Sequence, residues 1–479
     1  MPNTEHAKHT QHLEERPIRQ LLWQFSAPAI LATTVGASHQ FINRAFVSWI
    51  FGEVGVTAVT LVMPVTILMM GFGMLIGVGS NTLIAIKLGE KKVDDAERIV
   101  GQALFLFLLV SVVSIILVLP FIDTILHFFK ASERVLPYAK EYLSVSVCGI
   151  FLHQISFGIN SFLRSEGKPR LAMMTSIIAA LLNIVFDALF LFGFKTGIWG
   201  AAMATNLALA ISSSWVVWHY VYGNTLLRWR MKYIRPNFTL ARSVFLLGLP
   251  PFLVQFIGSC VHVLQNWQLK HYGDLYGAVH NIENYGDLAV GTVGLLFVIA
   301  MAIFMPLLGL NQGMQPIVGY NIGAGKHERV AKTLKLALVW QFAFTIFCSA
   351  FCLLFPALLI QAFISPVEER PDELMALGIH AIRIFVCMLP AAGFTVLVAG
   401  YFQSNGMAER AIMLTVVRQA GMLVPMLYFF PMLFEWFSGV DTGIEGIWWS
   451  IPCSDLGAGA LAILLFFQER RRLKKAHKY

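Results

Sequence analysis

Long runs of apolar residues, separated by short polar stretches, recur along the chain from Leu21 to Phe467. A helix needs about 20 apolar residues to cross the hydrocarbon core of a bilayer, and these runs are long enough. Their lengths and flanks predict about twelve membrane-spanning helices, and therefore an all-α polytopic membrane protein. The predicted spans begin near Leu21, Val56, Ile99, Ala139, Leu171, Ile198, Ser243, Leu288, Val330, Leu377, Ala411 and Gly446.

Four short motifs occur twice along the chain in the same order, which indicates an internal repeat. Each half then holds six spans, and because six is an even number, both halves enter the membrane from the same side. This pattern predicts two six-helix lobes related by a parallel repeat, as in transporters with alternating access. A channel or a membrane enzyme stays possible on this pattern alone. The pairs are Pro28 with Pro250, residues 89–92 with 323–326, 164–167 with 403–406, and 196–200 with 442–446.

The repeat and the polar stretches divide the chain into five parts. These are a polar N-terminal tail (1–16), an N-terminal lobe (17–223), an inter-lobe linker (224–242), a C-terminal lobe (243–468) and a basic C-terminal tail (469–479). The first part has no apolar stretch of signal-peptide length, so we interpret it as a tail and not as a cleaved leader.

Composition and charge agree with a membrane protein. Of the 479 residues, 57% are hydrophobic and 13% are charged, whereas soluble domains carry about 25% charged residues. The basic residues collect in alternate loops and the C-terminal tail, so we expect these loops and both termini in the cytoplasm. The net charge of +8 therefore does not indicate a nucleic-acid partner. The basic residues are Lys87, Lys91, Lys92, Arg98, Arg164, Lys168, Arg170, Arg228, Arg230, Lys232, Arg235, Arg242, Lys326, Arg329, Lys332, Lys335, Arg470, Arg471, Arg472, Lys474, Lys475 and Lys478.

Asp187 is a single carboxylate inside the apolar run 171–193. An ionisable residue within a span is costly, so it normally faces a bundle interior or an aqueous cavity on a transport path. Asn183 lies one helical turn before it, and Thr205 and Asn43 fall at a similar depth on neighbouring spans. Carboxylate, amide and hydroxyl oxygens suit a hard cation such as sodium, and burial favours a protonated carboxyl. We predict a cation- or proton-coupling site; a hydrogen-bonded network that only joins helices is the alternative.

The second half has Met422 and Met426 where Asn183 and Asp187 stand in the first, so the predicted ion site is asymmetric. Weaker candidates for substrate contact are His262, Gln265, Asn266, His380 and Arg383. Six cysteines all fall in apolar segments, with no spacing typical of a metal site or a disulfide framework. We expect no metal ion beyond possible sodium at Asp187, and no cofactor.

Three motifs resemble those of the multidrug and toxic-compound extrusion (MATE) transporters, particularly their DinF-like bacterial branch. The first is Gln-Gly-Met-Gln-Pro-Ile-Val-Gly-Tyr-Asn-Ile-Gly-Ala at 312–324; the others are 163–169 and 183–187. The resemblance extends from about Pro17 to Gln468. It implies two six-helix lobes, multi-pass insertion in the bacterial cytoplasmic (inner) membrane, and export of cationic amphipathic compounds in exchange for protons or sodium ions.

The resemblance also places Asn183, Asp187 and Thr205 on the family's N-lobe cation site. The chain departs from the family's pattern at two places. Asn43 stands where the family has an aspartate on the first helix, and the predicted outer loop 272–287 is extended. As partners we expect the lipid bilayer and small organic cations, with a monomeric protein that binds no nucleic acid and has no enzymatic activity.

Two other functions remain as alternatives. A flippase for lipid-linked sugars needs clusters of Arg or Lys to hold the pyrophosphate, and few basic residues fall inside the spans. A membrane-embedded enzyme, the less favoured alternative, needs at least two convergent catalytic groups, and Asp187 has no acid or histidine partner that the sequence identifies.

Overall fold

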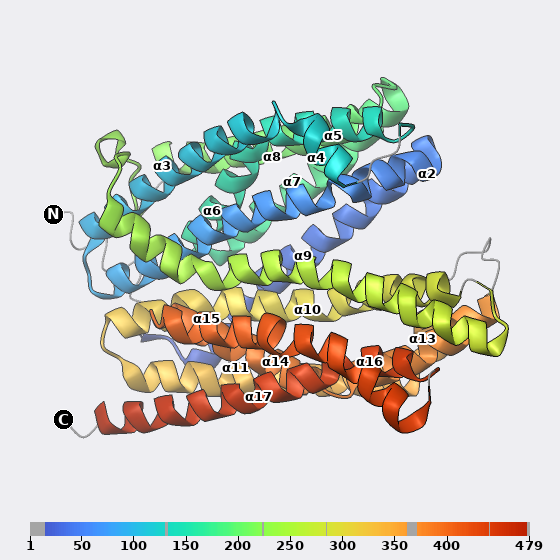
Figure 1. Ribbon diagram of the computed structural model, residues 1–479. Helices are drawn as coiled ribbons and strands as arrows, with labels where there is room; N and C mark the ends of the chain where they lie inside the picture. Colours follow the sequence, from blue (N-terminus) through green and yellow to red (C-terminus); the bar gives the residue numbers. More distant parts are fainter. Residues whose placement is uncertain are drawn as a thin grey trace. The chain divides into compact units, whose positions relative to one another are not determined.

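The structure is a computed structural model that describes residues 15–129, 133–222, 225–283, 285–361, 371–439 and 441–476 (Figure 1). These residues are nearly all helical, and none of them forms a strand, which confirms the predicted all-α fold class. The N-terminal residues 1–14 of the predicted tail lie outside the described residues. The helices are α2 (Ile18–Gly89), α3 (Val93–Val118), α4 (Ile122–Phe128), α5 (Leu136–Cys148), α6 (Ile150–Ser165), α7 (Pro169–Ala188), η1 (Leu189–Gly193), α8 (Trp199–Tyr222), η2 (Met231–Tyr233), α9 (Phe238–His280), α10 (Tyr285–Gly323), α11 (His327–Leu354), α12 (Pro356–Gln361), α13 (Pro371–Val386), α14 (Leu389–Ser404), α15 (Ala408–Val416), η3 (Val417–Leu423), α16 (Val424–Ser438) and α17 (Gly443–Ala476).

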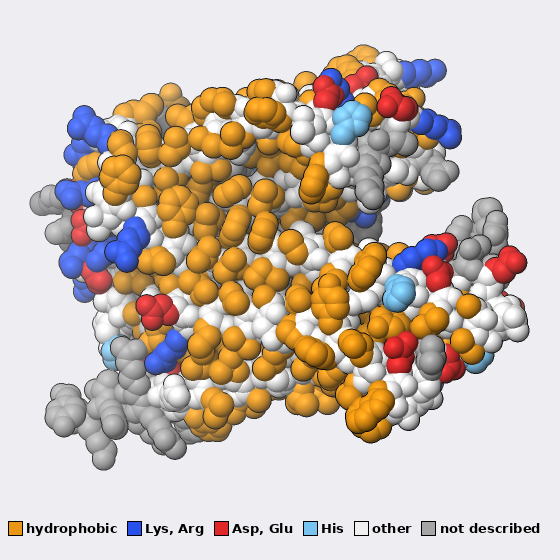
Figure 2. Space-filling model, viewed as in Figure 1, with side chains coloured by type: hydrophobic (Ala, Val, Ile, Leu, Met, Phe, Trp, Pro, Cys, Tyr) orange, Lys and Arg blue, Asp and Glu red, His pale blue; other side chains and the backbone are white. Residues whose placement is uncertain are grey.

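Nine helical segments among the described residues are long and apolar enough to cross a membrane, or up to eleven if two bent pairs each form one span. Figure 2 shows hydrophobic side chains along the flanks of the helices and charged ones gathered near helix ends. The remaining predicted span, near Leu21, is the first part of α2. A break at Gly52, where φ is 58°, separates it from the second predicted span. This first part is helical but carries many polar residues, among them Ser26, His39, Asn43 and Arg44.

The fourth span is broken at corresponding places in the two halves. Helices α5 and α6 meet at Gly149 with a bend of 49°, and α13 and α14 meet at Cys387 with a bend of 49°. Neighbouring helices bond carbonyl groups around each break. Asn206 Nδ2 donates to the Val145 carbonyl (2.7 Å), and Ser349 Oγ donates to the Val386 carbonyl (3.0 Å). Broken helices at matching positions are a feature of transporters built from internal repeats.

The described chain forms two compact units. Unit 1 comprises Met1–Gln255, Leu308–Leu334 and Gln403–Ala408; unit 2 comprises Phe256–Leu307, Lys335–Phe402 and Glu409–Tyr479. Unit 1 thus contains a segment of the second half around the end of α10. The lobe boundaries expected from the sequence stay a prediction.

Close backbone contacts between α2 and α10 explain why this segment belongs to unit 1. A Cβ atom added to Gly89 would overlap the carbonyl oxygen of Tyr320, and one added to Gly323 would overlap the carbonyl oxygen of Ile86. Only glycine allows the two helices to approach this closely at both positions.

Gly323→Ala should therefore destabilise the protein. The added methyl group has to displace helix backbone, which typically costs about 1–3 kcal/mol. Gly294→Ala is the matched control, because Gly294 lies in the same helix with no atom within 4 Å of an added Cβ. The measurement is the thermal unfolding midpoint in detergent. Equal midpoints for the two variants would contradict the contact.

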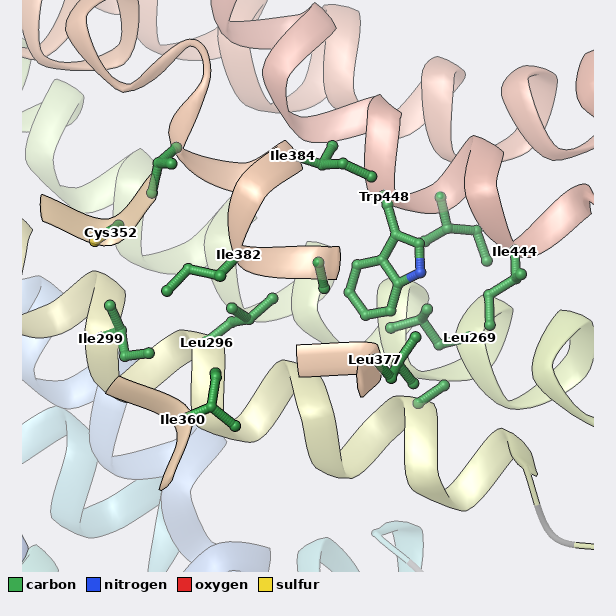
Figure 3. Packing of buried hydrophobic residues seen from close by; sticks show 14 of the residues in the cluster. Leu269, Leu296, Ile299, Cys352, Ile360, Leu377, Ile382, Ile384, Ile444 and Trp448 are labelled. Carbon is green, nitrogen blue, oxygen red and sulfur yellow. The ribbon is translucent and has the colours of Figure 1, made fainter. Parts of the chain in front are cut away.

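Unit 2 is built around a cluster of apolar side chains from α9, α10, α11, α12, α13 and α17 (Figure 3). Trp448 on α17 is 3% exposed and packs in the cluster together with Leu269, Leu377 and Ile444. A comparable cluster around Val62, Leu126 and Leu143 lies in unit 1. Each unit therefore has its own packed core.

Candidate functional site

The predicted ion site lies in unit 1, on helices α2, α7 and α8. Asn183 and Asp187 are one turn apart near the end of α7, and Thr205 lies in the second turn of α8. The π-helical stretch η1 begins two residues after Asp187. Irregular helix of this kind is common at functional sites.

The structure brings all four predicted residues together. Asn43 Nδ2 on α2 donates a hydrogen bond to Asp187 Oδ2 at 3.1 Å, which joins residues far apart in the sequence. The Asn183 amide lies 3.0 Å from the Thr205 hydroxyl. In the amide orientation that satisfies both of its ends, Asn183 donates to Asp187 Oδ2 (3.2 Å) and accepts from the Thr205 hydroxyl (3.0 Å). Their predicted role as a coupling site remains a prediction.

The Asp187 carboxyl is held on one side only. Its side chain is 0% exposed, and Oδ1 has no hydrogen-bond partner among the described residues. A buried oxygen without a donor is costly, and either a proton or a cation on that oxygen would relieve the cost. The surrounding amide and hydroxyl oxygens are ligands that sodium accepts. The residues present therefore fit a monovalent cation and fit a proton equally well.

The helices of unit 1 carry further polar residues that the sequence did not single out. Tyr142 on α5 lies within electrostatic range of Asp187, and His153 on α6 lies beside Asn206 and within range of His39. His39 precedes Asn43 by one turn of α2, so helical spacing alone would have identified it. Tyr142 and His153 lie on the two helices that meet at the break at Gly149, which no sequence pattern indicated.

The five weaker candidates all lie in unit 2. His262 is exposed and meets the Phe297 ring edge-on at 5.2 Å between ring centres. Gln265 is buried, whereas Asn266 and Arg383 are exposed. His380 pairs with Glu445 on α17 at 2.9 Å. A substrate role for these five residues stays a prediction.

The motif at 312–324 has a structural role in unit 1. Gln315 Nε2 donates to Gln403 Oε1 (3.4 Å), whose own amide donates to the Leu247 carbonyl (2.6 Å). Arg329 Nε donates to Asn321 Oδ1 at 3.1 Å. The motif therefore ties the end of α10 to residues distant in the sequence.

A buried carboxyl, Glu166, lies between α6 and α7. It is 1% exposed and faces the Tyr220 hydroxyl and the backbone N–H groups of Leu226 and Leu227, without good hydrogen-bond geometry to any of them. Burial raises the pKa of Glu166 from 4.5 to about 7, and the charge of Lys168 opposes the rise. Between these two pH values the folded protein binds a proton that the unfolded chain does not, so stability falls as the pH rises through this window.

Glu166→Gln should therefore be more stable than the parent above pH 7 and similar to it near pH 4.5. The thermal unfolding midpoint in detergent, measured across this pH range, checks the difference. Glu90→Gln is the control, because hydrogen bonds from Lys87 and Lys92 lower the pKa of Glu90. A variant whose midpoint follows the parent at every pH would contradict a buried, neutral Glu166.

Comparisons with known proteins agree with this fold and with the motifs. The family model MatE matches residues 28–189 and 280–429. The multidrug export protein MepA of Staphylococcus haemolyticus (strain JCSC1435) is 23% identical over 462 residues, covering 96% of each chain. MepA of Staphylococcus aureus (strain MSSA476) is 22% identical over the same length and also covers 96% of each chain.

Solved structures show the same fold. A MOP superfamily transporter from Pyrococcus furiosus Vc1 (DSM3638) superposes with a TM-score of 0.86 at 24% identity, covering 98% of each chain. A multidrug resistance MATE family transporter in an outward-facing conformation gives a TM-score of 0.85 at 24% identity, covering 98% of this chain and 99% of that one. Because the family model matches more than half of the sequence, this multi-pass membrane protein belongs to the MATE family of transporters.

Proposed function

We propose that the protein exports cationic amphipathic compounds from the cytoplasm of a bacterium in exchange for protons or sodium ions. The observation that carries this proposal is Asp187, a fully buried carboxyl with one oxygen bonded and the other without a partner among the described residues. Such a group can bind and release a single positive charge. The names of the MepA relatives, which are multidrug export proteins, support export as the direction and drugs as substrates.

The coupling follows from charge balance at Asp187. With a proton or a sodium ion bound, the site is neutral and remains stable in a low-dielectric interior. After the ion leaves, the buried negative charge favours a conformation that admits a substrate cation. Alternation between the two lobes would then carry substrate outward and the ion inward.

A direct test uses inverted and right-side-out membrane vesicles from cells that express the protein. Inverted vesicles should accumulate a fluorescent lipophilic cation when an outward-directed proton or sodium gradient is imposed, because their cytoplasmic face is outside. Right-side-out vesicles should expel the dye under the opposite gradient. Gradient-dependent movement in the reverse direction, or none in either preparation, would contradict the proposal and the assumed orientation in the inner membrane.

A further inference from the structure

An ion pair lies inside the membrane-spanning part of unit 2. Arg418 Nε donates to Asp455 Oδ1 at 2.7 Å, which joins η3 to α17. Asp455 lies near the middle of the span Gly443–Glu469. Arg418 lies about 15 Å along the span Ala408–Ser438, at 1.5 Å per residue. These helices correspond in the repeat to α7 and α8, which carry Asp187 and Thr205.

A charge pair at this depth is expensive. Ionisable residues within spans are rare and mark substrate or ion pathways when they occur. A pair that serves stability alone is often replaceable by apolar side chains without loss, so stability gives little reason to retain it. Stability alone is therefore a weak reason for Arg418 and Asp455 to lie at this depth.

The pair leaves most of its hydrogen-bonding capacity unused. Arg418 donates through Nε only, so its terminal guanidinium nitrogens have no partner in the part of the chain that the structure describes, and neither has Asp455 Oδ2. These unpaired atoms are not fully enclosed by the protein. The arginine side chain is 22% exposed and the aspartate 9%. A structural arginine–carboxylate pair is commonly bidentate, which uses both nitrogens of the fork.

A second ion pair between the same two membrane spans makes fuller use of its donors. Arg410 pairs with Glu469 at 2.7 Å near the ends of the two spans, and its guanidinium also lies 5.5 Å from the centre of the Phe402 ring. Arg410 makes additional interactions, whereas Arg418 makes only its bond to Asp455. The deeper pair is thus the one with unused donors and acceptors.

The neighbourhood of the pair is polar and irregular. Gln419, next to Arg418 in the π-helical η3, has a buried Oε1 without a partner among the described residues, and its amide nitrogen lies beside Gly258 on α9. The span that is broken at Cys387, with a bend of 49°, lies in the same unit as the pair. Broken spans and helix bulges near the middle of the membrane are where transporters place their binding sites.

We propose that Arg418 and Asp455 form a subsite for zwitterionic amphipathic substrates. The substrate's carboxylate binds the terminal nitrogens of Arg418, and its ammonium group binds Asp455 Oδ2. The complex is neutral overall because each charge of the substrate meets the opposite charge on Arg418 or Asp455. A zwitterion can therefore enter without leaving a charge unpaired in the membrane. This inference rests on the proposed export function and assigns the recognition of zwitterions to this one pair of side chains.

The test compares two transported probes that differ in one group. One is a fluorescent amphipathic amino acid, which is a zwitterion, and the other is its methyl ester, which is a cation. In proteoliposomes the parent should export both. The double variant Arg418→Met/Asp455→Leu should raise the KM for the zwitterion at least about tenfold, as expected for the loss of charge-assisted hydrogen bonds, and should raise the KM for the ester much less, because the ester has no carboxylate for Arg418 to bind.

The control Arg410→Met/Glu469→Leu removes the other ion pair between the same helices and should affect both probes equally. Arg418→Lys, which keeps the charge but loses the planar fork, should also weaken zwitterion transport selectively. If the apolar double variant does not fold, the test uses Arg418→Lys, together with competition between the two probes for binding to the purified parent protein. Equal losses for both probes, or ester export without zwitterion export by the parent, would overturn the subsite. Failure of the parent to export the ester would instead overturn the proposed function.

Discussion

Replacing Asp187 by asparagine should abolish gradient-driven export while the protein still folds and inserts. Asparagine has nearly the same shape and can still accept the hydrogen bond from Asn43, but it carries no charge and takes up no proton. We expect initial export rates to fall at least about a hundredfold, as for loss of a group whose charge drives the step. Export of a fluorescent cation from proteoliposomes, at matched protein content, measures this loss.

Two measurements accompany this variant. Its thermal unfolding midpoint should be equal to or above that of the parent, because a charged carboxyl is costly in a buried site. Asp123→Asn is the matched control, since Asp123 is an exposed carboxylate paired with Lys140 at 2.7 Å, and it should export normally. If Asp187→Asn exported as well as the parent, the polar cluster would serve only to join α2, α7 and α8.

Replacing Asn43 by aspartate should shift the pH dependence of transport upward. The amide nitrogen of Asn43 lies 3.1 Å from Asp187 Oδ2, so the substitution places two carboxyl groups in contact. Two carboxylates at this distance cannot both stay ionised, and the pair shares a proton near neutral pH. Rates measured across the pH range, with and without sodium, should show a higher midpoint and a weaker response to sodium at low pH.

Asn281→Asp is the control for this second prediction, because Asn281 is an exposed amide in the turn between α9 and α10, in unit 2, and Asp187 lies in unit 1. Its pH profile and sodium response should match those of the parent. A parental profile in Asn43→Asp would show that the contact between residues 43 and 187 plays no part in ion coupling.

The spans and most of the candidate site could be predicted from the sequence because both depend on local spacing. A helix of known rise places Asn183 and Asp187 on one face and sets their depth, and the same arithmetic brings Thr205 and Asn43 to that depth. The structure confirms that these four side chains meet. His39 lies one helical turn before Asn43, so the same spacing also places it on that face of α2.

The features that could not be predicted from the sequence depend on contacts between segments that are distant along the chain. The breaks at Gly149 and Cys387 lie within apolar runs that look continuous, and each divides a span into two helices that meet at 49°. Alignment of the halves placed Met426 opposite Asp187, which suggested that the second half has no membrane-embedded carboxylate there. Arg418 lies two turns earlier on that helix and pairs with Asp455, so the pair became visible only when α17 was placed beside η3.

The most direct test of ion-coupled export is efflux of a fluorescent lipophilic cation from proteoliposomes under one imposed gradient at a time. Purified protein is reconstituted, and either a pH gradient or a sodium gradient is applied with the membrane potential clamped. The account predicts that one of these gradients accelerates efflux from liposomes containing the parent, and that Asp187→Asn removes the acceleration. Efflux that is equally fast with neither gradient, or acceleration that persists in Asp187→Asn, would contradict it.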